Sequence, residues 1–196
     1  MTDPPFREPA PGALRLVQEF LNTNDIEDDH ERFASPGALH DWLAERELVD
    51  PGTPVTAQDL ARTIELREAL RALTAAHNHL SADVESATET ANRWSARAQL
   101  VPRLTATGAS LLEPQQSGVD GALGRIMVGV HAAIADGTWP RLKACERDSC
   151  RWAFYDHSKN QSGRWCQSSV CGTRERSRRA YRRRRRAQAQ SEPSSE

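Results

Sequence analysis

The four cysteines are the residues whose type and spacing carry the clearest chemistry. They form two pairs, Cys145 with Cys150 and Cys166 with Cys171, in the pattern C-x4-C-x15-C-x4-C. Two short-spaced pairs separated by about 12–20 residues are typical of a tetrahedral zinc site, in which each pair lies on a tight turn. The spacing predicts one structural Zn²⁺ held by four thiolates, which leaves no coordination position for a catalytic water.

Disulfides and unliganded thiols are the two other states that four cysteines can adopt. The N-terminal residues MTDPPFREPAPG lack the apolar stretch of an export signal, and no segment reaches the roughly 18 apolar residues of a membrane span. We therefore expect a cytoplasmic protein with no membrane association, and cytoplasmic thiols are kept reduced. This favours zinc over disulfides. His157, the histidine nearest to the cysteines, is expected in a turn rather than as a ligand.

An arginine-rich segment follows the last cysteine, and residues 174–186 read RERSRRAYRRRRR. Residues 141–190 contain 15 Lys and Arg against 4 Asp and Glu, whereas residues 1–140 contain 11 against 21. A helix with cations around most of its circumference repels itself unless a polyanion lies beside it. Phosphates are the expected partner, because counterion release would supply affinity. A solvated run of charge is the other interpretation.

The basic segment therefore predicts nucleic-acid binding, with DNA favoured. RNA stays as an alternative, although the sequence shows no stacked aromatic platform for single-stranded bases, and Trp152, Phe154 and Trp165 are expected in the small core of the finger. The predicted contacts are Lys159, Arg164, Arg174, Arg178, Arg179, Arg182 and Arg185.

The residues before the cysteines have helical periodicity. Ser35 and Thr56 are predicted to cap helices, Thr56 together with Asp59. Residues 101–113 predict a small β hairpin that turns at Thr107-Gly108. The expected helices cover about residues 13–22, 36–49, 57–80, 83–99 and 119–135.

The fold class predicted from these patterns is a mainly α N-terminal domain with a small β hairpin, followed by a small C-terminal zinc finger. In the finger, residues 152–155 are expected to form the first strand of a hairpin between the cysteine pairs, with a polar turn at 157–163 and a basic helix after Cys171. The predicted divisions are a flexible arm at 1–12, a helical domain at 13–140, the finger at 141–186 and a disordered tail at 187–196. Residues 137–144 are expected to join the helical domain to the finger.

The block CxxxxCxWxFxDxSxNxxxRWCxxxxCGTR closely resembles the CGNR zinc finger. In that family the finger follows an ABATE domain, which the front half resembles through FLNT at 20–23, ALHDWLAEREL at 38–48 and ELREALRAL at 65–73. The resemblance implies a stress-responsive bacterial transcription regulator, with the four cysteines as zinc ligands and a front domain that binds a small molecule. Two departures are Thr173, which stands where the family has Asn, and Gly163, where an Arg is usual.

By that resemblance, the candidate residues of a small-molecule pocket are Asn22, Thr23, Arg67 and Glu68. Arg67 also falls within an apolar stripe that contains Leu60, Ile64, Leu70 and Leu73, so its guanidinium needs an acceptor. An internal carboxylate is favoured over an anionic ligand as that acceptor.

The function that we expect is a zinc-dependent DNA-binding regulator whose helical domain senses an effector, forms a homodimer, or does both. The alternatives are an RNA- or ribosome-associated zinc protein and a thiol-based redox switch. An enzyme is not expected, since the sequence has no Ser-His-Asp order, glycine-rich phosphate loop or open metal site.

Overall fold

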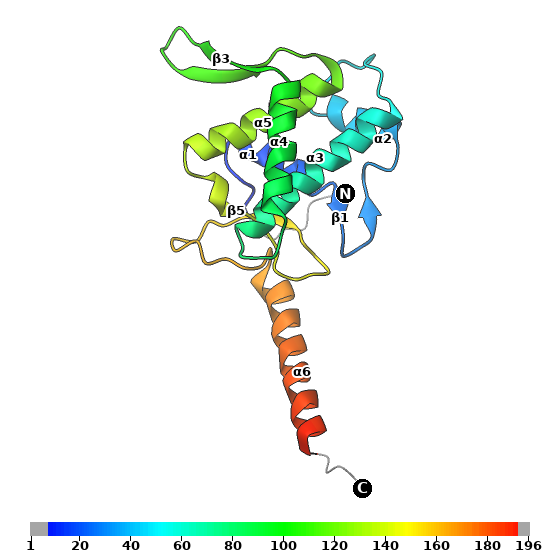
Figure 1. The fold of residues 1–196 in the computed structure, drawn as a ribbon, viewed down its shortest axis with the longest axis vertical. Helices are drawn as coiled ribbons and strands as arrows, with labels where there is room; N and C mark the ends of the chain where they lie inside the picture. The colour runs from blue at the N-terminus through cyan, green and yellow to red at the C-terminus, as the bar shows by residue number, and fades with distance from the viewer. Residues whose placement is uncertain (1–7, 192–196) are drawn as a thin grey trace.

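The computed structural model describes residues 8–191, apart from the side chains of residues 186, 187 and 189–191, and consists of a helical body from which one long helix projects (Figure 1). The helices of the body are α1 (Leu14–Leu21), α2 (Pro36–Ala44), α3 (Ala57–Ala76), α4 (Val84–Arg97) and α5 (Gly118–Ala135). Two antiparallel hairpins accompany them, β1 (Asn24–Asp25) with β2 (His30–Glu31) and β3 (Leu100–Leu104) with β4 (Ser110–Pro114). The 3-10 turn η1 (Trp139–Arg141), a third hairpin of β5 (Leu142–Ala144) and β6 (Ala153–Tyr155), the π turn η2 (Ser168–Gly172) and the projecting helix α6 (Thr173–Ser191) complete the chain.

The helix starts follow the capping residues of the sequence. Ser35 accepts a hydrogen bond from the Ala38 amide, and Thr56 and Asp59 form a reciprocal capping box. The β3–β4 hairpin also forms as predicted. Helix α3 ends at Ala76 rather than near residue 80, because the chain turns through His79 at a φ of 57°.

The apolar core lies between α1, α3, α4 and α5. Helix α5 packs closely on α1 because Gly129 has no side chain, and a Cβ there would lie 2.9 Å from the Ala13 carbonyl oxygen. By length and composition α5 could cross a membrane, but 56% of it is buried inside the protein. It is therefore a core helix.

The predicted stripe of α3 is only partly correct. Leu70 and Arg67 are buried, whereas Leu60, Ile64 and Leu73 are half-buried. The buried face of α3 is broader than one stripe and includes a second cation, Arg71, that the pattern did not reveal. The buried residues are Thr63, Leu66, Arg67, Ala69, Leu70, Arg71, Thr74 and Ala75.

The fold class is confirmed, but residues 137–144 are not a simple connection between two separate units. Leu142 is fully buried in β5, and it shares one apolar cluster with Ala153 and Tyr155 of β6 and with the helices of the body. The finger thus shares the apolar core of the helical domain, and a second, smaller cluster is formed by Cys145, Cys150 and Cys171, against which Trp152, Trp165 and Cys166 pack.

The hairpin of the finger differs from the prediction. Residues 153–155 do form a strand, β6, but β6 pairs with β5 upstream instead of with residues after the polar turn. The first cysteine pair therefore lies in the loop of the hairpin. The buried side chains of Leu142 and Ala144 make this pairing favourable, whereas Arg164 is exposed.

Both predicted chain ends differ in part from the structure. The amide of Ala10 donates to Gln18 Oε1 at 2.7 Å and Ala10 is buried, so residues 8–12 are attached to α1. Helix α6 continues to Ser191 and so includes the first five residues of the predicted disordered tail. The remaining parts of the predicted arm and tail, 1–7 and 192–196, lie outside the described residues.

Candidate metal centre and basic helix

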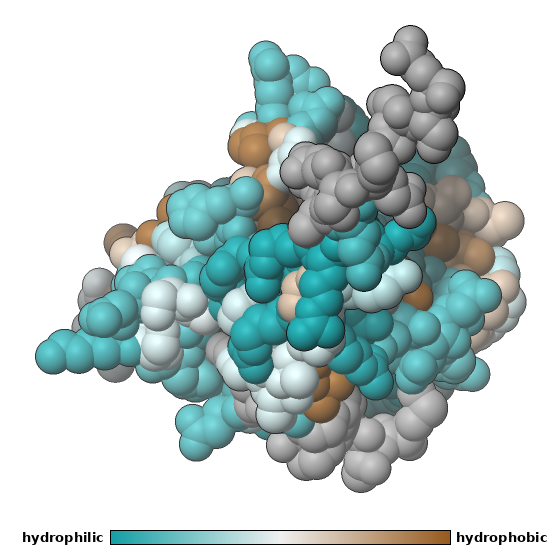
Figure 2. Space-filling model, turned by 90° about the horizontal axis from the view of Figure 1, so that it is seen from below, coloured by the Kyte–Doolittle hydropathy of each residue, from teal (hydrophilic) through white to brown (hydrophobic). Residues whose placement is uncertain are grey.

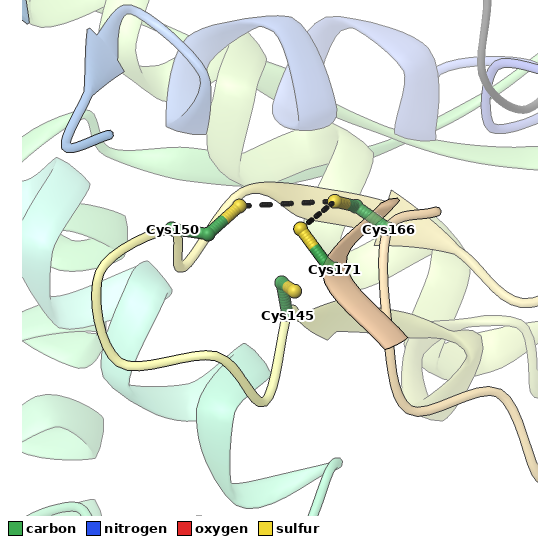
Figure 3. A group of neighbouring side chains, drawn as sticks. All are labelled: Cys145, Cys150, Cys166 and Cys171. Atoms are coloured by element: carbon green, nitrogen blue, oxygen red, sulfur yellow. Dashed lines mark hydrogen bonds between the residues drawn. The ribbon is translucent and has the colours of Figure 1, made fainter. Parts of the chain in front are cut away.

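The four cysteine side chains point toward a common centre (Figure 3). Their Sγ atoms all lie within 4.8 Å of one another, with 3.7 Å between Cys150 and Cys166 and 3.6 Å between Cys166 and Cys171. A tetrahedral Zn²⁺ with Zn–S distances of about 2.3 Å has S···S edges of about 3.8 Å. The donor set and its dimensions fit one zinc ion, and the four cysteines form a single zinc site.

Two tight turns present the cysteine pairs. In the first, the Cys145 amide donates to the Trp152 carbonyl at 2.9 Å, and the Cys150 amide to the Arg147 carbonyl at 2.9 Å. In the second, Cys166 precedes η2 and Cys171 lies within it, directly before α6, as the spacing predicts. Gly172 is needed there, because a Cβ would lie 3.2 Å from the Trp165 ring.

The thiols cannot all ionise without a cation between them. Hydrogen bonds from the Cys150 and Cys166 thiols lower the pKa of Cys145, and the resulting Cys145 thiolate raises the pKa of the Cys150 and Cys166 thiols. The negative charge of one thiolate thus opposes ionisation of the neighbouring thiols. A divalent ion removes this repulsion, which is the role that zinc has at such a site.

A buried ion pair organises the segment between the two cysteine pairs. Lys143 Nζ donates to Asp156 Oδ2 at 2.9 Å, and both residues are buried. Burial opposes the charge of Asp156, but hydrogen bonds from Ser158, Lys143 and Gly163 outweigh it and hold the pKa of Asp156 well below its usual range. Lys143 also donates to the carbonyl oxygens of Gln161 and Gly163.

The two sequence departures have different consequences. A Cβ at Gly163 would lie 2.8 Å from the Asp156 carboxylate. The absence of a side chain at Gly163 therefore leaves room for the buried ion pair of Asp156 with Lys143. Thr173 is the first residue of α6 rather than its cap, and its Oγ1 accepts a hydrogen bond from Arg176 Nη2 at 3.0 Å.

Side chains of the helical domain hold the backbone of the finger in place. The Asn22 amide group bonds both the carbonyl and the N–H of Ala153, at 2.9 and 2.8 Å. Asn78 Nδ2 donates to the Ala144 and Arg164 carbonyls, each at 2.8 Å, and these carbonyls adjoin the two cysteine turns. Arg71 adds a bond to the Arg151 carbonyl at 3.3 Å. Sequence analysis missed Asn78, Arg71 and Lys143, since no motif or spacing marks them.

Three of the four candidate pocket residues are in direct contact, since Arg67 donates hydrogen bonds to both Thr23 and Glu68. Asn22 and Thr23 line a cleft of about 810 Å³ between α1 and the finger, and Arg67 and Glu68 are not among its lining residues. The acceptors of Arg67 are internal: Thr23 Oγ1 at 3.0 Å, Glu31 Oε1 and Oε2 at 2.7 and 2.6 Å, and Glu68 Oε1 at 2.8 Å. The predicted internal carboxylate is therefore confirmed.

This ion pair shifts the pKa values of both partners. Burial disfavours the charge of each, but their mutual hydrogen bonds lower the pKa of Glu31 and raise that of Arg67. Both groups therefore stay charged at neutral pH.

The base of α6 carries arginines that are paired with carboxylates of the same chain. Glu27 of the β1–β2 loop accepts from Arg174, and from Arg147 at 2.7 Å. Glu146 accepts from Arg164, and from Arg179 at 2.8 Å. Arg178 pairs with Glu175 at 3.1 Å and with Asp148 at 3.6 Å.

The end of α6 is different. Arg182 and Arg185 are exposed, as are the two arginines between them, and the part of the chain that the structure describes provides no ion pair to any of the four. Lys159 is also exposed, on the segment between the cysteine pairs. Hydrophilic residues dominate the face from which α6 emerges (Figure 2).

Two protein families match this chain. Residues 14–139 match the ABATE family, described as "Putative stress-induced transcription regulator". Residues 141–185 match the CGNR zinc finger. Among curated proteins, none matches the chain.

Proposed function

Because the chain belongs to the ABATE family and ends in a CGNR zinc finger, we propose that it is a cytoplasmic bacterial regulator of transcription that binds DNA through α6. The zinc site is structural, since four thiolates occupy the tetrahedral positions of the ion and leave none for a substrate or water. We propose no catalytic activity.

The observation that supports DNA binding most directly is the group of exposed arginines at the end of α6, which form no ion pair with any residue that the structure describes. A helix of 19 residues is about 28 Å long, at about 1.5 Å per residue, and α6 projects away from the body for most of that length (Figure 1). The major groove of DNA, about 12 Å wide, admits one α-helix. In that position Arg182 and Arg185, with the arginines between them, would meet phosphates on both walls of the groove.

The predicted contact residues do not contribute equally to this proposal. Arg182 and Arg185 are the principal phosphate contacts. Arg164, Arg174, Arg178 and Arg179 each have a carboxylate partner, so they orient the helix first and contact phosphate only where that partner is displaced. Lys159 is exposed and would contact the backbone beside the groove.

The test is the salt dependence of binding to duplex DNA. Binding of the zinc-loaded protein is measured by fluorescence anisotropy at several salt concentrations. Replacing Arg182, Arg183, Arg184 and Arg185 by Ala should reduce the slope of log affinity against log salt by roughly 3 to 4, or about 0.9 per lost phosphate contact. The matched control is Arg103→Ala, an exposed arginine on β3 whose loss should leave the slope unchanged. An unchanged slope in the fourfold variant would contradict the proposal.

RNA or ribosome association is the competing outcome of the same measurement. A structured RNA that competes with duplex DNA at matched salt, and binds more tightly, would make RNA the partner of α6. Phosphate attraction alone does not distinguish the two nucleic acids, because it is independent of sequence.

The helical domain supplies the regulatory part of the proposal. Asn22 and Thr23 lie at the cleft beside the zinc site, so an effector bound there would contact both the helical domain and the finger. Homodimer formation through the same domain would place two α6 helices on one DNA duplex. Sedimentation with and without DNA tests the dimer.

A further inference from the structure

The cleft between α1 and the finger gives solvent access to one side of the zinc site. Cys150, Cys166 and Cys171 contribute to its lining, and Cys145 does not. Cys166 is half-buried, whereas the three other cysteines are buried. A small molecule in the cleft would therefore reach the sulfur of Cys166 more readily than that of any other zinc ligand.

Hydrogen-bond donors lie next to the sulfurs of the other three zinc ligands. Cys145 Sγ accepts from the backbone N–H groups of Arg147 and Cys166, and Cys150 Sγ accepts from that of Trp152. Cys171 Sγ lies 4.0 Å from Arg147 Nη1. Cys166 Sγ lies 3.7 Å from Cys150 Sγ and 3.6 Å from Cys171 Sγ.

Such donors affect reactivity, because an N–H donor withdraws electron density from a thiolate and makes it a poorer nucleophile. With zinc bound, all four sulfurs are thiolates. Cys166 is the least buried of the four ligands and lines the cleft, so exposure favours reaction at its sulfur.

We propose that Cys166 is a modification site, and that the cleft admits small conjugated carbonyl compounds to its thiolate. The sulfur of Cys166 forms a bond to the β-carbon of such a compound as the carbon–carbon π bond breaks. The electron pair moves to the carbonyl oxygen, and the enolate takes a proton from water, which leaves as hydroxide. Arg174, which lines the same cleft, has N–H groups that can hydrogen-bond the carbonyl oxygen.

Modification of Cys166 would uncouple α6 from the zinc site. A thioether carries no negative charge and is a weaker zinc ligand than a thiolate, so the site loses one of its four bonds. Cys166 immediately precedes the η2 turn that leads into α6. The modified protein would therefore release zinc and lose the fixed orientation of its basic helix. This goes beyond the proposed function, and its test requires no DNA.

The test uses full-length zinc-loaded protein with N-ethylmaleimide, a conjugated carbonyl probe, at less than one equivalent. Adduct positions are mapped by peptide mass spectrometry, and released zinc is followed with a chromogenic chelator. We expect the first adduct on Cys166, with about one zinc released per adduct. A first adduct on another cysteine, or zinc-loaded protein that does not react while zinc-free protein does, would overturn the proposal.

Two variants in one turn test the role of the cleft. Val170 lines the cleft, whereas Ser168 of the same η2 turn lines the separate hollow formed with Trp165. Val170→Trp should slow the Cys166 adduct about tenfold at unchanged zinc content, and Ser168→Trp should leave the rate unchanged. Equal rates in the two zinc-loaded variants would contradict access through the cleft. If Val170→Trp fails to hold zinc, the adduct map of the unchanged protein decides the question.

Discussion

The two ends of α6 have similar sequences and different surroundings. At its base, Arg174, Arg178 and Arg179 each contact a carboxylate of the same chain, and the finger and the β1–β2 loop supply those carboxylates. At its far end, Arg182 and Arg185 contact no carboxylate among the described residues and extend into solvent. The comparison teaches that a run of arginines can contain two groups, one that holds the helix and one that is available to a partner.

The largest effect is expected from removing the zinc site that anchors the base. Cys145→Ser should abolish zinc binding and unfold residues 142–175, because zinc contributes roughly 10–16 kcal/mol in small modules of this type. The orientation of the helix base would be lost, while the charge at the far end would remain. Zinc content by atomic emission and hydrogen exchange across the finger are the measurements. Retained zinc at one ion per chain would show that the assignment is wrong.

A smaller but still large effect is expected from the inward-facing cation of the finger. Lys143→Met leaves Asp156 buried without its partner, and breaking such a pair costs about 3–5 kcal/mol of unfolding free energy. Denaturant unfolding of the zinc-loaded protein measures it. The control is Arg103→Met, which breaks the exposed pair with Glu113 and should cost no more than about 0.5 kcal/mol. Equal losses of unfolding free energy in the two variants would mean that the buried ion pair contributes no more to stability than the exposed one.

The same ion pair predicts a pH dependence. Since the pKa of Asp156 is depressed in the folded protein, its contribution to stability is complete above its unfolded value of about 4. That contribution is lost as the pH falls from about 4 through the folded pKa. The Asp156→Asn variant should be less stable than the unchanged protein at pH 6, and this difference should narrow steadily below pH 4. A constant difference between pH 6 and pH 3 would refute the assignment.

The smallest effect is expected from removing a carboxylate that pairs with arginines at the base of α6. Glu27→Gln removes the charge that holds Arg147 and Arg174 but keeps the side-chain size. We expect tighter DNA binding with a salt slope steeper by about 1, and a stability loss within about 1 kcal/mol. The control is Glu113→Gln on β4, which should change neither quantity, since the β3–β4 hairpin lies at the opposite end of the molecule from α6 (Figure 1). A slope that stays the same would mean that Arg174 is available to phosphate even with Glu27 present.

Local signals predicted most helix starts and the metal ligands correctly. Ser35 and the Thr56–Asp59 box act through hydrogen bonds within three residues, and their effect does not depend on distant parts of the chain. The cysteine spacing is equally local within each pair. The hairpin of the finger was predicted with the wrong partner, because β6 could pair on either side and the burial of Leu142 beneath the helical domain decided between them.

The partners of the buried polar and charged side chains could not be predicted from the sequence. The sequence showed that Arg67 needs an acceptor, but Glu31 is 36 residues away and reaches it only through the β1–β2 hairpin. Asn78 donates to two carbonyls, of which Ala144 is 66 residues away and Arg164 is 86 residues away. Contacts over such separations depend on how the helices pack.

By itself, the sequence of this protein determined its four zinc ligands, the caps of its helices, and the excess of positive charge at its C-terminal end. Each of these is a matter of residue type and short spacing. Only the tertiary structure decided which arginines are neutralised and which are free, and that Cys166 is the zinc ligand most exposed to the cleft. The physical reason is that ion pairing and solvent access depend on distances of a few ångströms between segments that lie far apart in the chain.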